Sequence, residues 1–142
     1  MTAAESGGVA RVVRVVHARG SLSRTEIADS LGLNRSTVAT IIANLVNGGL
    51  VEEKSGVAGG VGRPSLTVTA TPTAMATIGC DLRENHTSLL AWGLGGRELG
   101  RWEQPHIGAL GDPVAAATRV VSGVGELVAS LPEVRQIGRA HV

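Results

Sequence analysis

The stretch from Leu31 to Gly49, LGLNRSTVATIIANLVNGG, constrains the fold more than any other part of the chain. Its apolar residues recur at i, i+3, i+4, i+7 and i+8, the spacing that builds one stripe on an α-helix. Asn34 is a suitable N-cap for that helix, and Gly48 with Gly49 supplies a left-handed stop at its other end. The pattern predicts an amphipathic helix whose apolar stripe faces a core. The members of the stripe are Val38, Ile41, Ile42, Leu45 and Val46.

The opposite face of this helix is small, polar and almost free of acids. A surface of this kind can enter the major groove of DNA, where short polar side chains reach base edges. A solvated helix face is the alternative interpretation. The predicted DNA-binding residues are Arg35, Ser36, Thr37, Thr40 and Asn44, on a face that also holds Ala43 and Asn47.

Two further helices are expected before this one. Ser23 and Glu26 have the spacing of a capping box, so a helix should begin there and end at Gly32. An earlier helix is predicted over residues 9–19, after a disordered N-terminus at residues 1–8. Its Arg11, Arg14 and His17 are expected to be a solvated face rather than phosphate contacts. A helix, a short turn and a second helix make a helix-turn-helix.

Two strands, predicted over residues 50–54 and 66–70, should follow as a hairpin and complete a winged helix-turn-helix domain over residues 9–72. The loop between them, SGVAGGVGRPS, is rich in glycine and carries a single charge, Arg63. An arginine on such a wing suits contact with phosphate or the minor groove, so Arg63 joins the predicted DNA-binding residues. A wing that serves only as a loop is the alternative.

From residue 73 the pattern becomes β-rich, with strands predicted over 76–82, 87–94 and 97–103. Asp112 followed by Pro113 predicts the start of a helix. Three strands and one helix leave a sheet edge open, so residues 73–136 are expected to be part of a larger domain. The apolar stripe expected on the helix consists of Val114, Ala117, Val121, Val124, Val128 and Leu131.

Composition excludes several classes of protein. The single cysteine, Cys80, excludes a disulfide framework and a Cys-rich zinc site within the chain, so no metal or cofactor is expected. The formal net charge of +1 means that DNA affinity must come from the placement of charges. Only Trp92 and Trp102 are aromatic, which disfavours stacking on single-stranded nucleic acid. Without a signal peptide or a membrane span of ~20 residues, we expect a cytoplasmic protein.

The order of these segments resembles the transcriptional regulators of the ROK family (repressors, open reading frames and sugar kinases). The resemblance rests on TEIADSLGLNRSTVATIIANLVNGGLVEE, GRPSLTV, TIGCDL and GGREL. It implies an α+β chain: a winged helix-turn-helix followed by the incomplete first β-β-β-α of a ribonuclease H-like, actin-type ATPase domain. It also implies a regulator that binds a double-stranded DNA operator, is a homodimer when full-length, and responds to a sugar through a site beyond this chain.

Three alternatives remain. ROK kinases carry a DxGxT-type phosphate loop, but Arg83 and Asn85 stand at the expected Gly and Thr here, so Asp81 is expected to cap a turn and a sugar kinase fragment is disfavoured. A MarR-like regulator would share the helix-turn-helix. A protein-interaction module would expose more apolar surface. The last six residues, IGRAHV, resemble a translated sequencing adapter, so 137–142 is expected to be a non-native tail and the chain a truncated fragment.

Overall fold

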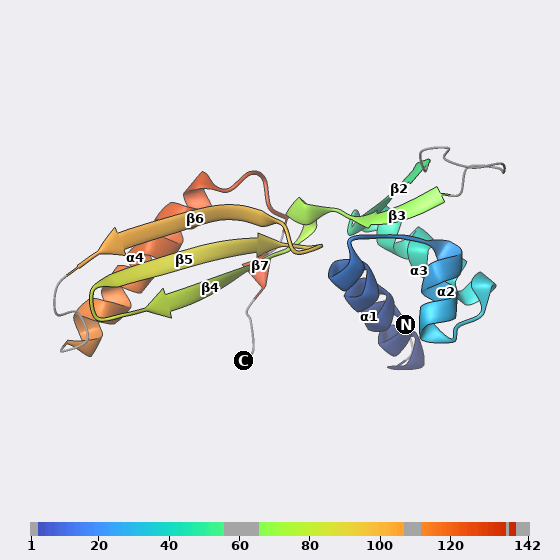
Figure 1. Cartoon of the computed structure of the whole chain (residues 1–142), viewed down its shortest axis with the longest axis horizontal. Coiled ribbons are helices and arrows are strands. Elements are labelled where there is room, and N and C mark those ends of the chain that lie inside the picture. Colours follow the sequence, from blue (N-terminus) through green and yellow to red (C-terminus); the bar gives the residue numbers. More distant parts are fainter. Residues whose placement is uncertain (1–2, 56–65, 107–111, 136, 139–142) are drawn as a thin grey trace. The chain divides into compact units, whose positions relative to one another are not determined.

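The computed structural model describes residues 3–55, 66–106, 112–135 and 137–138, and it divides into two compact units (Figure 1). The N-terminal unit comprises the described residues up to Thr71 together with Leu94–Gly96. The C-terminal unit comprises Pro72–Gly93 and the described residues from Arg97 onward. The mixed α+β class is confirmed, and the division at Thr71 lies one residue from the boundary predicted at residue 72.

The N-terminal unit consists of three helices and a three-stranded antiparallel sheet. The order of elements is α1 (Ala3–Arg19), β1 (Ser21–Ser23), α2 (Arg24–Leu31), α3 (Arg35–Asn47), β2 (Val51–Ser55) and β3 (Leu66–Ala70). In the sheet β3 lies between β1 and β2. The side chains of α1, α2 and α3 that face one another form one core with the sheet. Its large fully buried members are Val12, Val16, Ile27, Val38, Ile42 and Val68.

The ends of α2 follow the sequence prediction. The Glu26 backbone N–H donates to the Ser23 hydroxyl (3.2 Å), and the Ser23 N–H donates to the Glu26 carboxylate (2.7 Å), which completes the capping box. Gly32 ends the helix with φ +61°, a left-handed conformation that favours glycine. α2 therefore begins and ends where local chemistry places its ends.

The ends of α3 differ from the prediction in one detail. Asn34 precedes the helix with extended backbone angles, but its side chain makes no capping hydrogen bond. At the other end Gly48 is right-handed (φ −76°), and the left-handed residue is Gly49 (φ +67°). The left-handed stop expected from the Gly48–Gly49 pair is therefore present at Gly49, whereas the side-chain cap expected from Asn34 is not made, so its amide is available for another role.

Two features of this unit were not predicted. Residues 3–8 belong to α1, so the prediction of a disordered stretch is wrong for them. At Gly8 this part of the helix lies against α3, since a Cβ built there would lie 3.3 Å from the Ile41 Cδ1 atom. The strand β1 was also missed, because three residues carry no periodic signal, yet Leu22 is buried and pairs with Val68.

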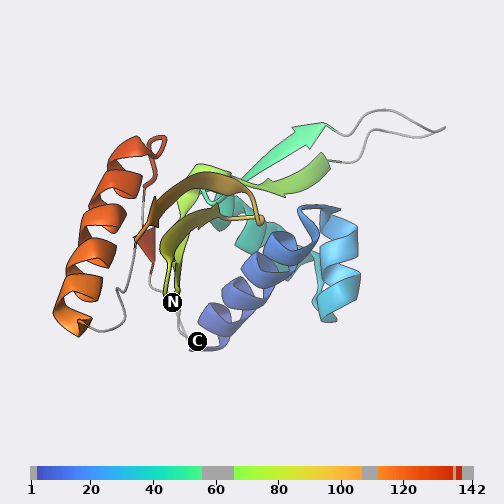
Figure 2. The ribbon, with the colours of Figure 1, turned by 60° about the vertical axis from the view of Figure 1, so that its left-hand side comes forward.

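The C-terminal unit is a four-stranded sheet with one helix on a face. Its elements are η1 (Pro72–Ala74), β4 (Ala76–Leu82), β5 (His86–Gly93), β6 (Glu98–Pro105), α4 (Pro113–Ser130) and β7 (Ile137–Gly138). The sheet order is β6-β5-β4-β7, with β7 parallel to β4, and α4 packs on β5 and β6 (Figure 2). The predicted meander is confirmed. Residues 137–138 of the predicted tail pair with β4, while 139–142 lie outside the described residues.

The predicted N-cap of α4 is confirmed, but its predicted apolar stripe is only partly correct, since Val124 and Leu131 pack against the core of this unit. Asp112 accepts hydrogen bonds from the backbone N–H groups of Val114 (2.9 Å) and Ala115 (3.2 Å). However, Val114 and Val121 are 74% and 71% exposed. The buried residues of the helix are Ala116, Gly123 and Leu127.

The reason for this rotation of α4 is the shape of the sheet. The Trp102 ring of β6 occupies the space beside Gly123, where an added Cβ would come within 2.7 Å of it. The Trp102 indole N–H also donates to the Glu126 carboxylate (2.8 Å). A bulky ring needs a small partner, so glycine rather than valine faces the sheet.

The turn between β5 and β6 belongs to the core of the N-terminal unit. Leu94 is 8% exposed and packs in the cluster formed by the three helices and β3. The Gly95 backbone N–H donates to the His17 Nδ1 atom (3.0 Å). Gly95 has φ +83°, and a Cβ there would lie 3.0 Å from the Ala70 Cβ atom, so glycine suits the position twice over. A domain defined as residues 9–72 lacks this contribution.

Candidate nucleic-acid interface

The exposed face of α3 brings together the predicted recognition residues. Arg35, Ser36, Thr37, Thr40 and Asn44 are all exposed in the structure. The apolar stripe behind them is buried, except that Val46 is 37% exposed at its edge. The sequence therefore predicted correctly which side of the helix meets solvent. That these residues contact DNA stays a prediction.

Local hydrogen bonds decide what each side chain can offer. The hydroxyl of the exposed Thr40 donates to the Ser36 backbone carbonyl (3.1 Å), which uses its proton and leaves its oxygen able to accept a hydrogen bond. Such a threonine can accept a hydrogen bond from a base or contact a thymine methyl. Arg35 and Asn34 make no side-chain hydrogen bond or ion pair within the described residues. Asn34 is thus a candidate that sequence analysis missed, because its position before the helix suggested a cap.

Several basic residues near the interface are engaged in structural contacts. Arg11 donates to the Leu31 backbone carbonyl (2.7 Å), and Arg19 donates to the Ser30 hydroxyl (3.2 Å). Both contacts hold the C-terminal half of α2 against α1. Arg11, Arg14 and His17 are exposed, as expected for a solvated face, although His17 also accepts a hydrogen bond from the Gly95 backbone N–H.

A bidentate ion pair connects α2 with β2. The Arg24 Nε and Nη2 atoms donate to the two carboxylate oxygens of Glu53, each at 2.7 Å. These hydrogen bonds raise the pKa of Arg24 above its ordinary value. The side chains are 40% and 17% exposed, respectively. Sequence analysis did not find this pair, because its members are far apart in the chain.

The predicted wing residue Arg63 lies outside the described residues, as does the loop 56–65. The strands that flank the loop are described, and each pairs along its whole length: Val51 faces Ala70 and Ser55 faces Leu66. The start and the end of the predicted wing are therefore held together by the sheet.

The turn between β4 and β5 is closed by a backbone hydrogen bond and an exposed ion pair, and within the described residues the Asp81 carboxylate is not seen to cap a backbone N–H. The Arg83 Nε atom donates to the Asp81 carboxylate (2.8 Å), and the Arg83 backbone N–H donates to the His86 carbonyl (2.9 Å). An arginine thus neutralises the acid that a kinase would direct at phosphate. Among the described residues, no cluster of three or more His, Cys, Asp or Glu side chains could hold a metal ion.

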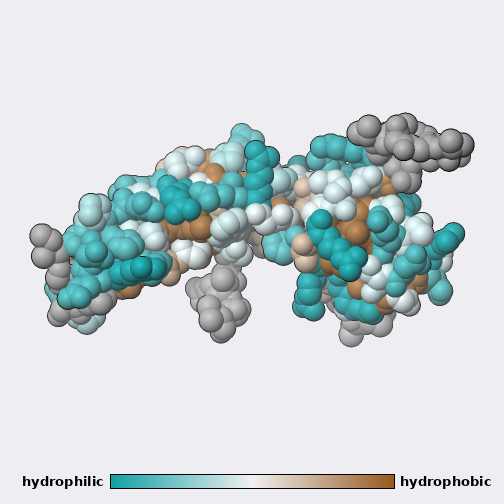
Figure 3. All heavy atoms as spheres, viewed as in Figure 1, coloured by the Kyte–Doolittle hydropathy of each residue, from teal (hydrophilic) through white to brown (hydrophobic). Residues whose placement is uncertain are grey.

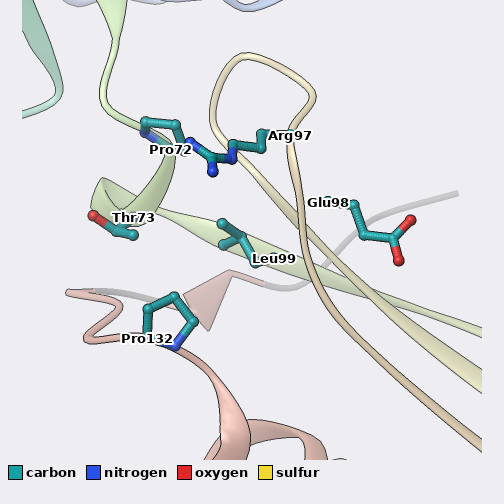
Figure 4. Close-up of a pocket in the computed structure, with 6 residues that line it drawn as sticks. All are labelled: Pro72, Thr73, Arg97, Glu98, Leu99 and Pro132. Atoms are coloured by element: carbon teal, nitrogen blue, oxygen red, sulfur yellow. The ribbon is translucent and has the colours of Figure 1, made fainter.

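Cavities of about 260 to 570 Å³ lie on the surface of the described parts. One of about 270 Å³ is lined by Pro72, Thr73, Arg97, Glu98, Leu99 and Pro132 (Figure 4). Figure 4 shows the Glu98 side chain directed away from the others, and this carboxylate is paired with Arg101. Drug-sized ligands usually occupy ~300–1,000 Å³, so this cavity is below that range. On the face shown in Figure 3, hydrophilic and neutral residues predominate, with apolar residues in small patches.

The comparisons with known proteins agree with this geometry. The IclR helix-turn-helix domain matches residues 9–55. A transcriptional regulator of Mycobacterium bovis is 35% identical over 98 residues, which is 68% of this chain and 22% of that protein. Two regulators of Mycobacterium tuberculosis match equally well. The chain thus spans about a fifth of the length of these curated relatives.

A solved structure extends the likeness to both units. It is a ROK family transcriptional regulator described as a homologue of the E. coli MLC protein. The match covers 92% of this chain and 34% of the solved chain, with a TM-score of 0.60 and a sequence identity of 18%. The chain has the fold of a ROK family transcriptional regulator. This confirms the mixed α+β fold expected from the sequence, in which the helix-turn-helix precedes the second sheet. No helix in the described residues is long and apolar enough to cross a membrane.

Proposed function

We propose that this chain is the DNA-binding part of a transcriptional regulator and that α3 is its recognition helix. One observation carries the proposal: α3 exposes an acid-free polar face while its other face is buried in the core of a helix-turn-helix. The major groove of B-DNA accepts an α-helix of this kind. The matched helix-turn-helix domain and the regulator relatives support it.

The geometry suggests a different role for each residue. Asn44 has an amide that can bind adenine bidentately, and Thr40 offers an acceptor and a methyl group. Arg35, at the start of the helix, suits guanine or a phosphate. Ser36 and Thr37 suit phosphate oxygens, and so does Arg63 on the wing.

Other parts of the proposal depend on the resemblance to ROK regulators. We propose that the full-length protein is a cytoplasmic homodimer that binds half-sites about one helical turn, ~34 Å, apart or a multiple of it. We further propose that it responds to a sugar through residues beyond this chain. The ion pair between Asp81 and Arg83 supports a non-enzymatic role for the turn that would hold phosphate in a kinase.

Selection from a pool of random DNA duplexes tests the proposal. The chain, joined to a dimerising partner, should enrich one pseudo-palindromic motif. Failure to enrich any motif would refute the assignment of α3 as a recognition helix.

Single substitutions then separate base reading from anchoring. Thr40→Ala or Asn44→Ala should each cost on the order of 1–3 kcal/mol of discrimination between the selected motif and its single-base variants. Asn47→Ala is a matched control, because this amide lies on the last turn of α3 and should read no base. Arg63→Ala should weaken binding evenly across sequences and flatten its salt dependence. Equal loss of discrimination from Asn47→Ala and Asn44→Ala would contradict the proposed roles.

A further inference from the structure

Glu53 is an acid on the core-facing side of the sheet. It lies on β2 opposite Val68, which is fully buried, and it shares its face with the buried Val51. Its side chain is only 17% exposed. A carboxylate placed there loses much of its hydration and needs a charged partner. Arg24 is that partner.

The pairing fixes the orientation of the Arg24 guanidinium. Two parallel N–H···O hydrogen bonds of 2.7 Å use its Nε and Nη2 atoms. A guanidinium held by two hydrogen bonds cannot rotate about the bonds of its side chain. The Nη1 atom makes no hydrogen bond within the described residues and the side chain is 40% exposed, so one edge of the guanidinium remains open to a ligand.

The position of Arg24 in the motif identifies the ligand that this edge would meet. Arg24 is the first residue of α2, directly after the capping residue Ser23. In a helix-turn-helix the helix before the recognition helix crosses the DNA backbone, where helix N-termini and arginines commonly contact phosphates. Glu53 lies on β2, which begins after α3 and runs toward the loop 56–65.

We propose that Arg24 anchors a DNA phosphate and that Glu53 is the residue that positions it. The proposal rests on the proposed function, because it adds an anchoring residue to the same interface. It also means that Glu53 favours DNA binding although its carboxylate and the DNA are both negatively charged. Arg24 acts on phosphate directly, and Glu53 acts only through Arg24.

The two possible effects of Glu53 on DNA binding have opposite signs. If the carboxylate only repels phosphate, Glu53→Gln should tighten binding. If it positions Arg24, the same change should weaken binding, since the guanidinium then samples many orientations. Glu52→Gln is the matched control: the neighbouring acid makes an exposed ion pair with Lys54 (2.8 Å, 65% and 46% exposed), and its removal changes the charge by the same amount.

The test is duplex binding by the 142-residue chain, joined to the same dimerising partner, followed by fluorescence anisotropy over a range of NaCl concentrations. Arg24→Gln should reduce the slope of log K against log[salt] by about one and lower affinity at low salt at least tenfold. Glu53→Gln should weaken binding several-fold, whereas Glu52→Gln should leave it unchanged or tighter. The double variant Arg24→Gln/Glu53→Gln should bind no worse than Arg24→Gln.

Arg24→Lys distinguishes binding of a DNA phosphate by Arg24 from an ion pair that only stabilises the fold. A lysine keeps the charge but loses the fork, so it should keep the salt slope while affinity falls several-fold. A purely structural pair would lower the unfolding temperature and leave the salt slope of Arg24→Gln unchanged, which would overturn the proposal. Tighter binding by Glu53→Gln, as for Glu52→Gln, would also overturn it. If the unmodified chain binds no duplex, the proposed function itself fails.

Discussion

Replacement of Leu94 by alanine should destabilise the N-terminal unit, although the residue lies in the β5–β6 turn. Leu94 is 8% exposed and packs among the residues of α1, α3 and β3. The change removes three carbons, and at ~0.8 kcal/mol for each buried methylene the transfer term is about 2.4 kcal/mol. A residual cavity adds to this, so we expect a loss of between about 2 and 4 kcal/mol in the free energy of unfolding.

Leu66→Ala provides the matched control. Leu66 belongs to the same unit but is 48% exposed, so the same chemical change should cost about 1 kcal/mol or less. For a domain of this size each kcal/mol shifts the unfolding temperature by roughly 4–8 °C. The two variants should therefore differ by several degrees.

The assay must report on the N-terminal unit. Both tryptophans, Trp92 and Trp102, lie in the C-terminal unit, so their fluorescence follows the other half of the chain. Native-state hydrogen exchange at the amides of Val12 and Ile42 reports on the unit in question, because both side chains are fully buried in its core. If Leu94→Ala changes their protection no more than Leu66→Ala does, the turn is not part of this core and the reasoning is wrong.

Four further predictions concern the capping box, packing and the surface. Ser23→Ala should cost about 1 kcal/mol in unfolding free energy by removing the capping box, as measured by urea unfolding. The Ser23 backbone N–H holds the pKa of Glu26 below its ordinary value. The contribution of Glu26 to the free energy of unfolding is therefore present at neutral pH and is lost as the pH falls through that pKa. Glu26→Gln should abolish this part of the pH dependence of stability. Gly123→Ala should destabilise the C-terminal unit by about 1–3 kcal/mol, because its Cβ would lie 2.7 Å from the Trp102 ring, and unchanged tryptophan-detected unfolding would refute this. Val121→Ser should change stability by less than about 0.5 kcal/mol, since the side chain is 71% exposed, and should reduce self-association in sedimentation experiments; a large loss of stability would mean that Val121 is buried after all.

Local sequence patterns determined the helix-turn-helix. The capping box at Ser23, the left-handed glycine at position 32 and the apolar spacing of α3 each depend on residues within one or two turns of one another. Interactions over so short a distance along the chain can be recognised from the sequence, so the ends of α2 and the exposed face of α3 were predicted correctly. The N-cap at Asp112 belongs to the same class.

Contacts between residues distant in sequence could be decided only by the tertiary structure. The periodicity of α4 predicted that Val121 is buried. The Trp102 ring leaves room only for a glycine beside it, so Gly123 lies against the sheet and Val121 is exposed. Leu94 joins a core built from residues more than twenty positions earlier, and Glu53 meets Arg24 across 29 positions. Periodicity ranks the faces of one element by hydrophobicity, whereas shape and charge complementarity between elements decide which face is buried.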